Sequence, residues 1–235
     1  PVSTRTADEQ PVFRPAVRSV IDTADPPVLS RNALLTQQDK QAIAVVAGPA
    51  TNLARTLALN GGREIVAAKV QLLVIAAGAF DGKTADPRIR ADVVSAQKIF
   101  AEWPSPIIAV GIEAATAVPY PDQGMESELA AIPDHPTVVA YRAYRQKQPA
   151  GTSGVPAQGV LAALYAANSS AEYLKLSRPG QIDVAADGRT IFKESPAGTH
   201  RYIVIDSAEK QRITEAFVKM SAARPAAGGR GGPRN

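Results

Sequence analysis

Short, uninterrupted apolar runs alternate with amphipathic segments in the first half of the chain, and this alternation constrains the fold more than any other feature. The apolar runs are Ala42–Ala47, Gln71–Ala76 and Ile107–Ile112, whereas Thr51–Leu59 and Asp92–Trp103 have helical spacing. Continuous apolar runs of this length are typical of strands buried on both faces of a parallel sheet. The order strand, helix, strand, helix, strand therefore predicts an α/β fold with an open, mostly parallel sheet and flanking helices.

The second half of the chain is predicted to contain more helix. Asp187-Gly188 is a strong turn signal between two β-prone segments, and it predicts a hairpin. The expected helices are 126–132, 135–146, 155–167 and 207–223, and the expected strands are 181–184, 190–192 and 200–205.

Local composition divides the chain into three parts. Residues 1–40 contain several prolines and few periodic apolar positions, so we expect an extended arm with at most one short helix near 16–21. Residues 41–224 form the expected α/β domain. The end of the chain, 225–235, is rich in Gly, Pro and Arg and is predicted to be a flexible tail. The tail contains a single RGG-like copy, which is too little to indicate an RNA-binding segment, so a solvated terminus is favoured.

The residue types present exclude several classes of site. Cysteine is absent, which excludes disulfides, thiolate zinc sites, iron–sulfur clusters and cysteine nucleophiles. The two histidines, His135 and His200, have no second metal-binding residue at helical spacing, so we expect surface or capping positions for both. The net charge of +4 comes from scattered basic residues, and nucleic-acid binding is therefore not expected. No apolar run approaches the ~18 residues that a membrane-spanning helix needs.

Polar loops follow the predicted strands at the sheet edge where open α/β folds bind ligands. The segment 48–52, Gly-Pro-Ala-Thr-Asn, follows the first strand. Two interpretations of it remain open: a tight turn in which Thr51 or Asn52 caps the next helix, or part of a ligand site. The loop 78–88 follows the second strand and predicts a polar pocket wall. Neither G-x-G-x-x-G nor G-x-x-x-x-G-K-[ST] spacing occurs, so a phosphate-binding loop is not expected.

The strand ends resemble those of one known family. Residues 48–54 are similar to the G-P-x-T-N-x-A turn of the inosine–uridine-preferring nucleoside hydrolases, 75–79 to their M-G-G-A strand end, and 108–112 to the strand before their V-T segment. The resemblance extends over 42–223 and implies the fold of that family. Two later segments, 176–180 and 198–202, resemble a divergent and often exported bacterial branch, which implies an exported or periplasmic location.

The resemblance also implies a metal site, but several of the family's metal-binding residues have no counterpart in this sequence. In the family, N-terminal aspartates, one backbone carbonyl and a later aspartate hold a calcium ion that activates water and binds the ribose hydroxyls. The carbonyl maps onto Ala47. The opening D-x-D-x-x-x-D-D segment has no counterpart in the sequence, and we expect the chain to begin after that segment, so that the N-terminal part of the family fold is missing. No cofactor is therefore expected.

The ribose-binding segment of the family maps onto 82–92. Asp86 and Asp92 remain acidic there, whereas Lys83 and Arg88 replace asparagines, and their positive charges would oppose metal binding. The candidate substrate-binding residues are thus Asn52, Asp86, Arg88 and Asp92.

The catalytic positions of the family are altered as well. Its histidine–aspartate pair, which protonates the leaving base and completes calcium ligation, maps onto Gln158 and Gly159. Neither residue supplies a useful proton or a carboxylate ligand.

These departures predict a nucleoside hydrolase-like protein that is catalytically degenerate and acts as a binding or assembly subunit. The alternative is an active N-ribohydrolase that uses calcium and takes its metal-binding aspartates from an absent N-terminal segment or a partner chain. The strand at Ala42–Ala47 would leave an apolar sheet edge open. We therefore expect a homo- or hetero-oligomer in which a partner covers that edge.

Overall fold

The computed structural model describes residues 5, 8–11, 17, 19–122, 127, 136–149, 154–155 and 157–222. Most of the expected helix at 126–132, His135 and the expected tail at 225–235 lie outside the described residues. Within the described ranges, no helix is both long and apolar enough to cross a membrane.

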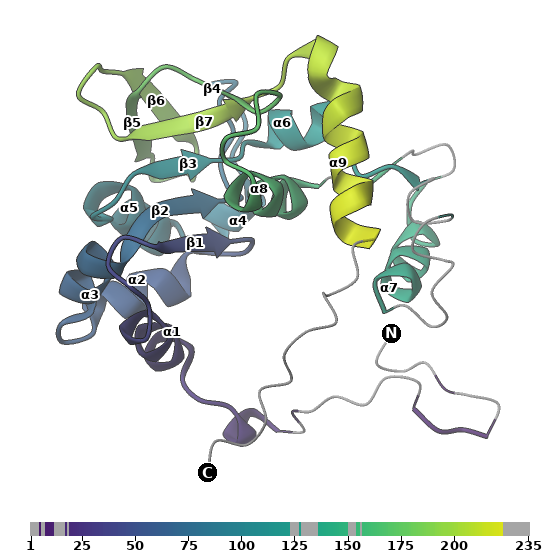
Figure 1. Cartoon of the computed structure of the whole chain (residues 1–235), viewed down its shortest axis with the longest axis horizontal. Helices are drawn as coiled ribbons and strands as arrows, with labels where there is room; N and C mark the ends of the chain where they lie inside the picture. The colour runs from purple at the N-terminus through teal and green to yellow at the C-terminus, as the bar shows by residue number, and fades with distance from the viewer. Residues whose placement is uncertain are drawn as a thin grey trace.

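The described strands form one mixed sheet with a parallel centre (Figure 1). Its order is β1-β2-β3-β7-β5-β6, and β4 pairs with β7 beside this path. The bounds are β1 Ala42–Val46, β2 Val70–Ile75, β3 Ile107–Ala109, β4 Lys175–Leu176, β5 Gly180–Val184, β6 Thr190–Glu194 and β7 His200–Val204. The β1–β2, β2–β3 and β3–β7 pairs are parallel, and the pairs made by β4, β5 and β6 are antiparallel. The sequence prediction of an open, mostly parallel α/β sheet is confirmed in this coarser form.

Helices cover both faces of the parallel centre. Their bounds are α1 Pro26–Leu35, α2 Thr51–Ala58, α3 Gly62–Lys69, α4 Pro87–Arg90, α5 Val93–Glu102, α6 Ile112–Ala117, α7 Pro136–Arg145, α8 Gln158–Ala167 and α9 Lys210–Ala222, with short 3-10 turns at Val20–Asp22 and Ser207–Glu209. Alternate side chains of β2 enter opposite cores, as the period of a strand requires. Leu73 and Ile75 pack with α2, α3 and α5, whereas Val74 packs with α8 and α9 on the other face.

Strand β1 differs from its sequence prediction. It forms the edge of the described sheet, in agreement with the expected open edge, but Val45 is 43% exposed, so the strand is not buried on both faces. An apolar run alone does not distinguish a central strand from an edge strand, because both are short and both have an apolar face that packs against the core.

The first forty residues also contain a helix that was not expected. Helix α1 has ten residues and begins with Pro26 and Pro27, so the prediction of at most one short helix was wrong. Proline is compatible with the first turn of a helix because its missing N–H has no partner there anyway. Pro27 is buried, and an exposed ion pair of 3.1 Å joins Asp25 to Arg55 on α2.

The second half is close to prediction, with two boundary corrections. The predicted hairpin is β5–β6, and Gly188 has a φ of +86° in its turn. The expected strand 107–112 ends at Ala109, because Gly111 caps a new helix, α6. Helix α8 begins at Gln158 rather than at Val155, which instead forms an isolated antiparallel bridge with Tyr120.

Candidate functional site

The carboxyl ends of β1, β2 and β3 meet the start of α8, and polar groups from all four places converge there. Ala47 follows β1, the loop that contains Asp86 and Arg88 follows β2, and Gln158 is the first residue of α8. We call Ala47, Asp86, Arg88 and Gln158 the carboxyl-end cluster. Parallel strands bring their carboxyl ends to one edge of the sheet, which explains how residues so distant in sequence come together.

Asp86 is the buried acid of this cluster. It is fully buried and caps the N-terminus of α4, where its Oδ1 accepts a hydrogen bond of 2.7 Å from the backbone N–H of Arg88. Its Oδ2 accepts hydrogen bonds from the backbone N–H of Gly78 at 3.0 Å and from Nε2 of Gln158 at 2.8 Å. Both carboxylate oxygens are therefore engaged inside the protein, which offsets the cost of burying a charge.

Arg88 places a positive charge against the same group of oxygens. Its Nε donates to the backbone carbonyl of Ala47 at 3.3 Å, and its Nη1 donates to Oε1 of Gln158 and lies 3.9 Å from Oδ1 of Asp86. The Arg88 side chain is 33% exposed, so it remains partly open to solvent. The planar guanidinium suits contact with several oxygens at once, because it carries several N–H donors that point in fixed directions.

Gln158 closes the cluster from α8. It is buried, and its amide nitrogen also donates to the carbonyl of Val110 after β3, at 2.7 Å. Its amide donors and its oxygen are thus committed to Asp86, Val110 and Arg88. The neighbouring Gly159 lies over Ala47: a Cβ added at Gly159 would be 3.1 Å from the Ala47 Cβ. Positions 47, 86, 88, 158 and 159 therefore share one site.

Asp92 and Asn52 lie outside the carboxyl-end cluster. Asp92 caps α5 through the backbone N–H of Ser95 at 3.0 Å and accepts a 2.5 Å hydrogen bond from the hydroxyl of Thr51. Hydrogen bonds from Ser95 and Thr51 hold the pKa of Asp92 below its usual range. The side chain of Asn52 is exposed, and its backbone carbonyl accepts from the hydroxyl of Thr56. The Thr51–Asp92 hydrogen bond ties the N-termini of α2 and α5 together, which is a structural role.

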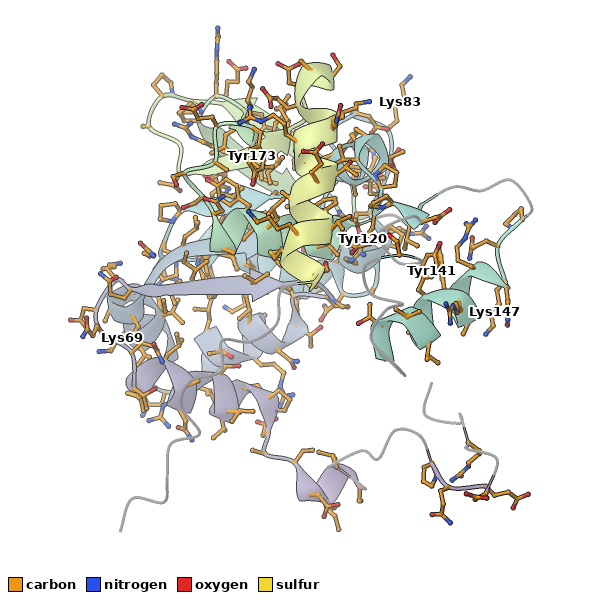
Figure 2. All side chains as sticks on the ribbon, turned by 45° about the vertical axis from the view of Figure 1, so that its right-hand side comes forward. Lys69, Lys83, Tyr120, Tyr141, Lys147 and Tyr173 are labelled. Carbon is orange, nitrogen blue, oxygen red and sulfur yellow. The ribbon has the colours of Figure 1, made fainter. Side chains whose placement is uncertain are left out.

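The predicted polar loop 78–88 is held from several sides. Glu113 on α6 accepts hydrogen bonds from the backbone N–H groups of Phe80 at 2.6 Å and Asp81 at 3.0 Å. Asp81 accepts from both the hydroxyl and the backbone of Thr84, and these bonds lower its pKa to about 2. Lys83 is exposed and extends from the periphery (Figure 2). The expected effect of Lys83 on the site thus has no contact to support it.

Sequence reasoning missed the partners that fix this loop. Gly78 has a φ of +113° and offers its N–H to Asp86, and Val110 offers only a backbone carbonyl. Thr190 on β6 is buried, accepts from the N–H of Ala79 at 2.9 Å and donates to the Ala79 carbonyl at 2.5 Å. A backbone N–H or carbonyl is present in nearly every residue, so the sequence does not indicate which of them will bind a side chain. Gly78 at the strand end was the one partner that the sequence pattern marked.

His200 lies in the core and not at the site. It is buried on β7, where its Nδ1 accepts from the backbone N–H of Ile182 at 3.0 Å. Burial lowers its pKa to about 4, so it is neutral at ordinary pH. The expectation of a surface or capping histidine was wrong for His200.

The residues of the site do not fit the calcium ion that the family resemblance implies. Calcium takes six to eight oxygen ligands. Here the Ala47 carbonyl accepts from Arg88, both oxygens of Asp86 accept hydrogen bonds, and Gly159 has no side chain. Among the described residues, no three His, Asp or Glu side chains are grouped so that they could hold a metal ion. A guanidinium beside these oxygens further opposes a second cation.

Comparison with known proteins assigns the family. The chain belongs to the inosine–uridine preferring nucleoside hydrolase family, whose model matches residues 5–220. A search of curated proteins found no significant match.

Solved structures of the same fold include nucleoside hydrolases from several sources. A plant nucleoside hydrolase is 20% identical with a TM-score of 0.62, and the match covers 89% of this chain and 70% of the other. A purine-preferring ribonucleoside hydrolase from Gardnerella vaginalis is 17% identical with a TM-score of 0.66 and covers 90% and 69%. An inosine–uridine preferring nucleoside hydrolase from Bacillus anthracis is 18% identical with a TM-score of 0.59, again over 90% and 69%. At these identities the matches establish the fold.

Proposed function

We propose that this chain is a nucleoside hydrolase-like protein that does not hydrolyse nucleosides and acts as a binding or assembly subunit. The observation that carries the proposal is the commitment of Gln158, at the family's acid position, to three partners inside the fold. Departure of a nucleobase needs a proton donor, and general acid catalysis typically contributes ~10²–10⁴ in rate. An amide with engaged donors does not provide that proton.

The second requirement of the reaction is an activated water. Asp86 is an acid in direct contact with Gln158, but its two oxygens accept three hydrogen bonds and it is fully buried. Asp92 caps a helix. Neither carboxylate is arranged as a free general base, and the residues present do not fit a calcium ion that would take its place.

The test is release of free base from inosine and uridine by the purified chain, with and without calcium. We expect none above background. We also expect Gln158→His with Gly159→Asp not to restore release, because the double variant still lacks carboxylates for the metal. Clear calcium-dependent turnover by the chain as given would reject the proposal and favour an active N-ribohydrolase.

The assembly part of the proposal rests on β1. Among the described strands, β1 has a neighbour on one side only, and its Val45 is 43% exposed. The backbone N–H and C=O groups of an open edge are a template for a further strand. A strand from a second copy or from another protein would satisfy them.

Oligomeric state tests this part directly. We expect light scattering to find a species larger than the monomer, and Val45→Lys to reduce its size because it places a charge at the strand edge. Val94→Lys is the matched control, since Val94 is 75% exposed on α5. A monomer at high concentration, or an oligomer unaffected by Val45→Lys, would argue against edge pairing.

A further inference from the structure

The guanidinium of Arg88 has the contacts of a bound cation. We propose that Arg88 is a built-in cation of the carboxyl-end cluster, which holds Ala47, Asp86 and Gln158 in place and keeps metal ions away from their oxygens. The proposal concerns what organises the site, and it does not depend on whether the chain cleaves nucleosides.

Arg88 faces three oxygen atoms of different kinds. They are a backbone carbonyl oxygen, a carboxylate oxygen and an amide oxygen, from Ala47, Asp86 and Gln158. Oxygens of these three kinds are the ligands that hard divalent cations use. In this chain each of them has a donor atom of one guanidinium within 3.9 Å. The same oxygens cannot serve a metal ion while Arg88 occupies the space before them.

Arg88 also balances the charge of Asp86. Asp86 is fully buried, and a buried carboxylate needs a partner charge or a full set of hydrogen bonds. In the described part of the chain, Arg88 is the only basic side chain within ion-pair distance of Asp86. The Arg88 side chain is one-third exposed and the Asp86 side chain is fully buried, so the cation of this pair is the partner in contact with solvent.

The start of α4 fixes the position of Arg88. Arg88 lies in the first turn of α4, and its own backbone N–H binds Asp86, the cap of that helix. The cap therefore fixes the base of the side chain, and its tip then reaches the ends of β1 and α8. Removing the side chain alone should keep the backbone cap and leave a solvent-open space in front of these oxygens.

Chemical rescue of an arginine deletion tests the proposal. In Arg88→Ala we expect a lower thermal midpoint of the full chain, and a saturable increase of that midpoint on adding methylguanidinium chloride at low millimolar concentration, since a ligand that binds the native state stabilises it. Methylammonium chloride should restore less, because it lacks the planar fork. Arg90→Ala is the matched control on the same helix: Arg90 is exposed, and methylguanidinium should not raise its midpoint.

Calcium provides a second readout on the same variants. We expect calcium to leave the midpoints of the wild type and Arg90→Ala unchanged. It should raise the midpoint of Arg88→Ala, but less than methylguanidinium does, because the variant frees the Ala47 and Gln158 oxygens without adding a carboxylate. The proposal would be overturned if neither methylguanidinium nor calcium raised the thermal midpoint of Arg88→Ala more than that of Arg90→Ala. If Arg88→Ala does not fold, Arg88→Lys decides: one ammonium cannot reproduce the fork, so a Lys variant as stable as the wild type would contradict the assignment.

Discussion

Replacing Asp86 should destabilise the fold more than replacing any exposed acid. In Asp86→Ala, three donors lose their acceptor: the backbone N–H groups of Gly78 and Arg88 and Nε2 of Gln158. Breaking a buried charge pair costs ~3–5 kcal/mol, and each buried donor left unpaired costs ~1–3 kcal/mol. Because the partly exposed Arg88 side chain can be rehydrated, the charge-pair cost should largely disappear. We therefore expect about 3–5 kcal/mol, the lower part of the ~3–9 kcal/mol for three unpaired donors.

Urea unfolding followed by the fluorescence of Trp103, the single tryptophan, measures this loss. With a slope of ~2–3 kcal/mol per M urea, the midpoint should fall by roughly 1–2 M. Asp183→Ala is the control, because its 3.0 Å ion pair with Lys193 is exposed and should contribute no more than ~1 kcal/mol. Asp86→Asn keeps one acceptor oxygen and should lie between the two. An Asp86→Ala loss no larger than the Asp183→Ala loss would refute the account of the cluster.

Three further predictions concern the surroundings of the site. The folded pKa of His200 is about 4, below its ordinary value of 6.5, so the unfolded chain binds a proton first as pH falls. The wild type should therefore lose about 3 kcal/mol relative to His200→Asn between pH 6.5 and pH 4, and parallel pH profiles of unfolding would contradict this. Thr190→Val should cost ~1–3 kcal/mol in thermal unfolding, because both hydrogen bonds to Ala79 disappear in a buried place; a change near zero would be the contrary result. Asp92→Ala should cost ~0.5–2 kcal/mol as a lost helix cap, and its effect on unfolding should be independent of calcium.

The parallel centre could be predicted from sequence because each signal was local. Residues 42–46 and 72–75 are continuous apolar runs, and the hairpin turn at Gly188 is encoded in two residues. What local patterns could not give is the position of a strand in the sheet. Val45 is exposed because β1 is an edge, and that depends on its neighbours in space. Helix α1 was missed because two prolines were weighed as helix breakers although the first turn tolerates them.

The candidate site was predictable in its positions and not in its contacts. The family resemblance placed Ala47, Asp86, Arg88 and Gln158 at corresponding positions, and these four do converge. The sequence predicted Arg88 only as a charge that opposes a metal. Its hydrogen bond to the Ala47 carbonyl depends on the side-chain direction set by the cap of α4, which no sequence pattern specifies. Asp92 was grouped with Asp86 as an acid, but it binds Thr51 and Ser95 instead.

The central claim is that a guanidinium, and not a metal ion, sits against the Ala47 carbonyl. Nitrogen-15 NMR of the arginine Nε–H groups measures this most directly, with the Arg88 resonance identified by its loss in Arg88→Lys. We predict that the Arg88 Nε–H exchanges slowly with water and that millimolar calcium does not shift its resonance, because the hydrogen bond to Ala47 persists. A rapidly exchanging Nε–H, or a resonance that moves in a saturable way as calcium is added, would contradict the account.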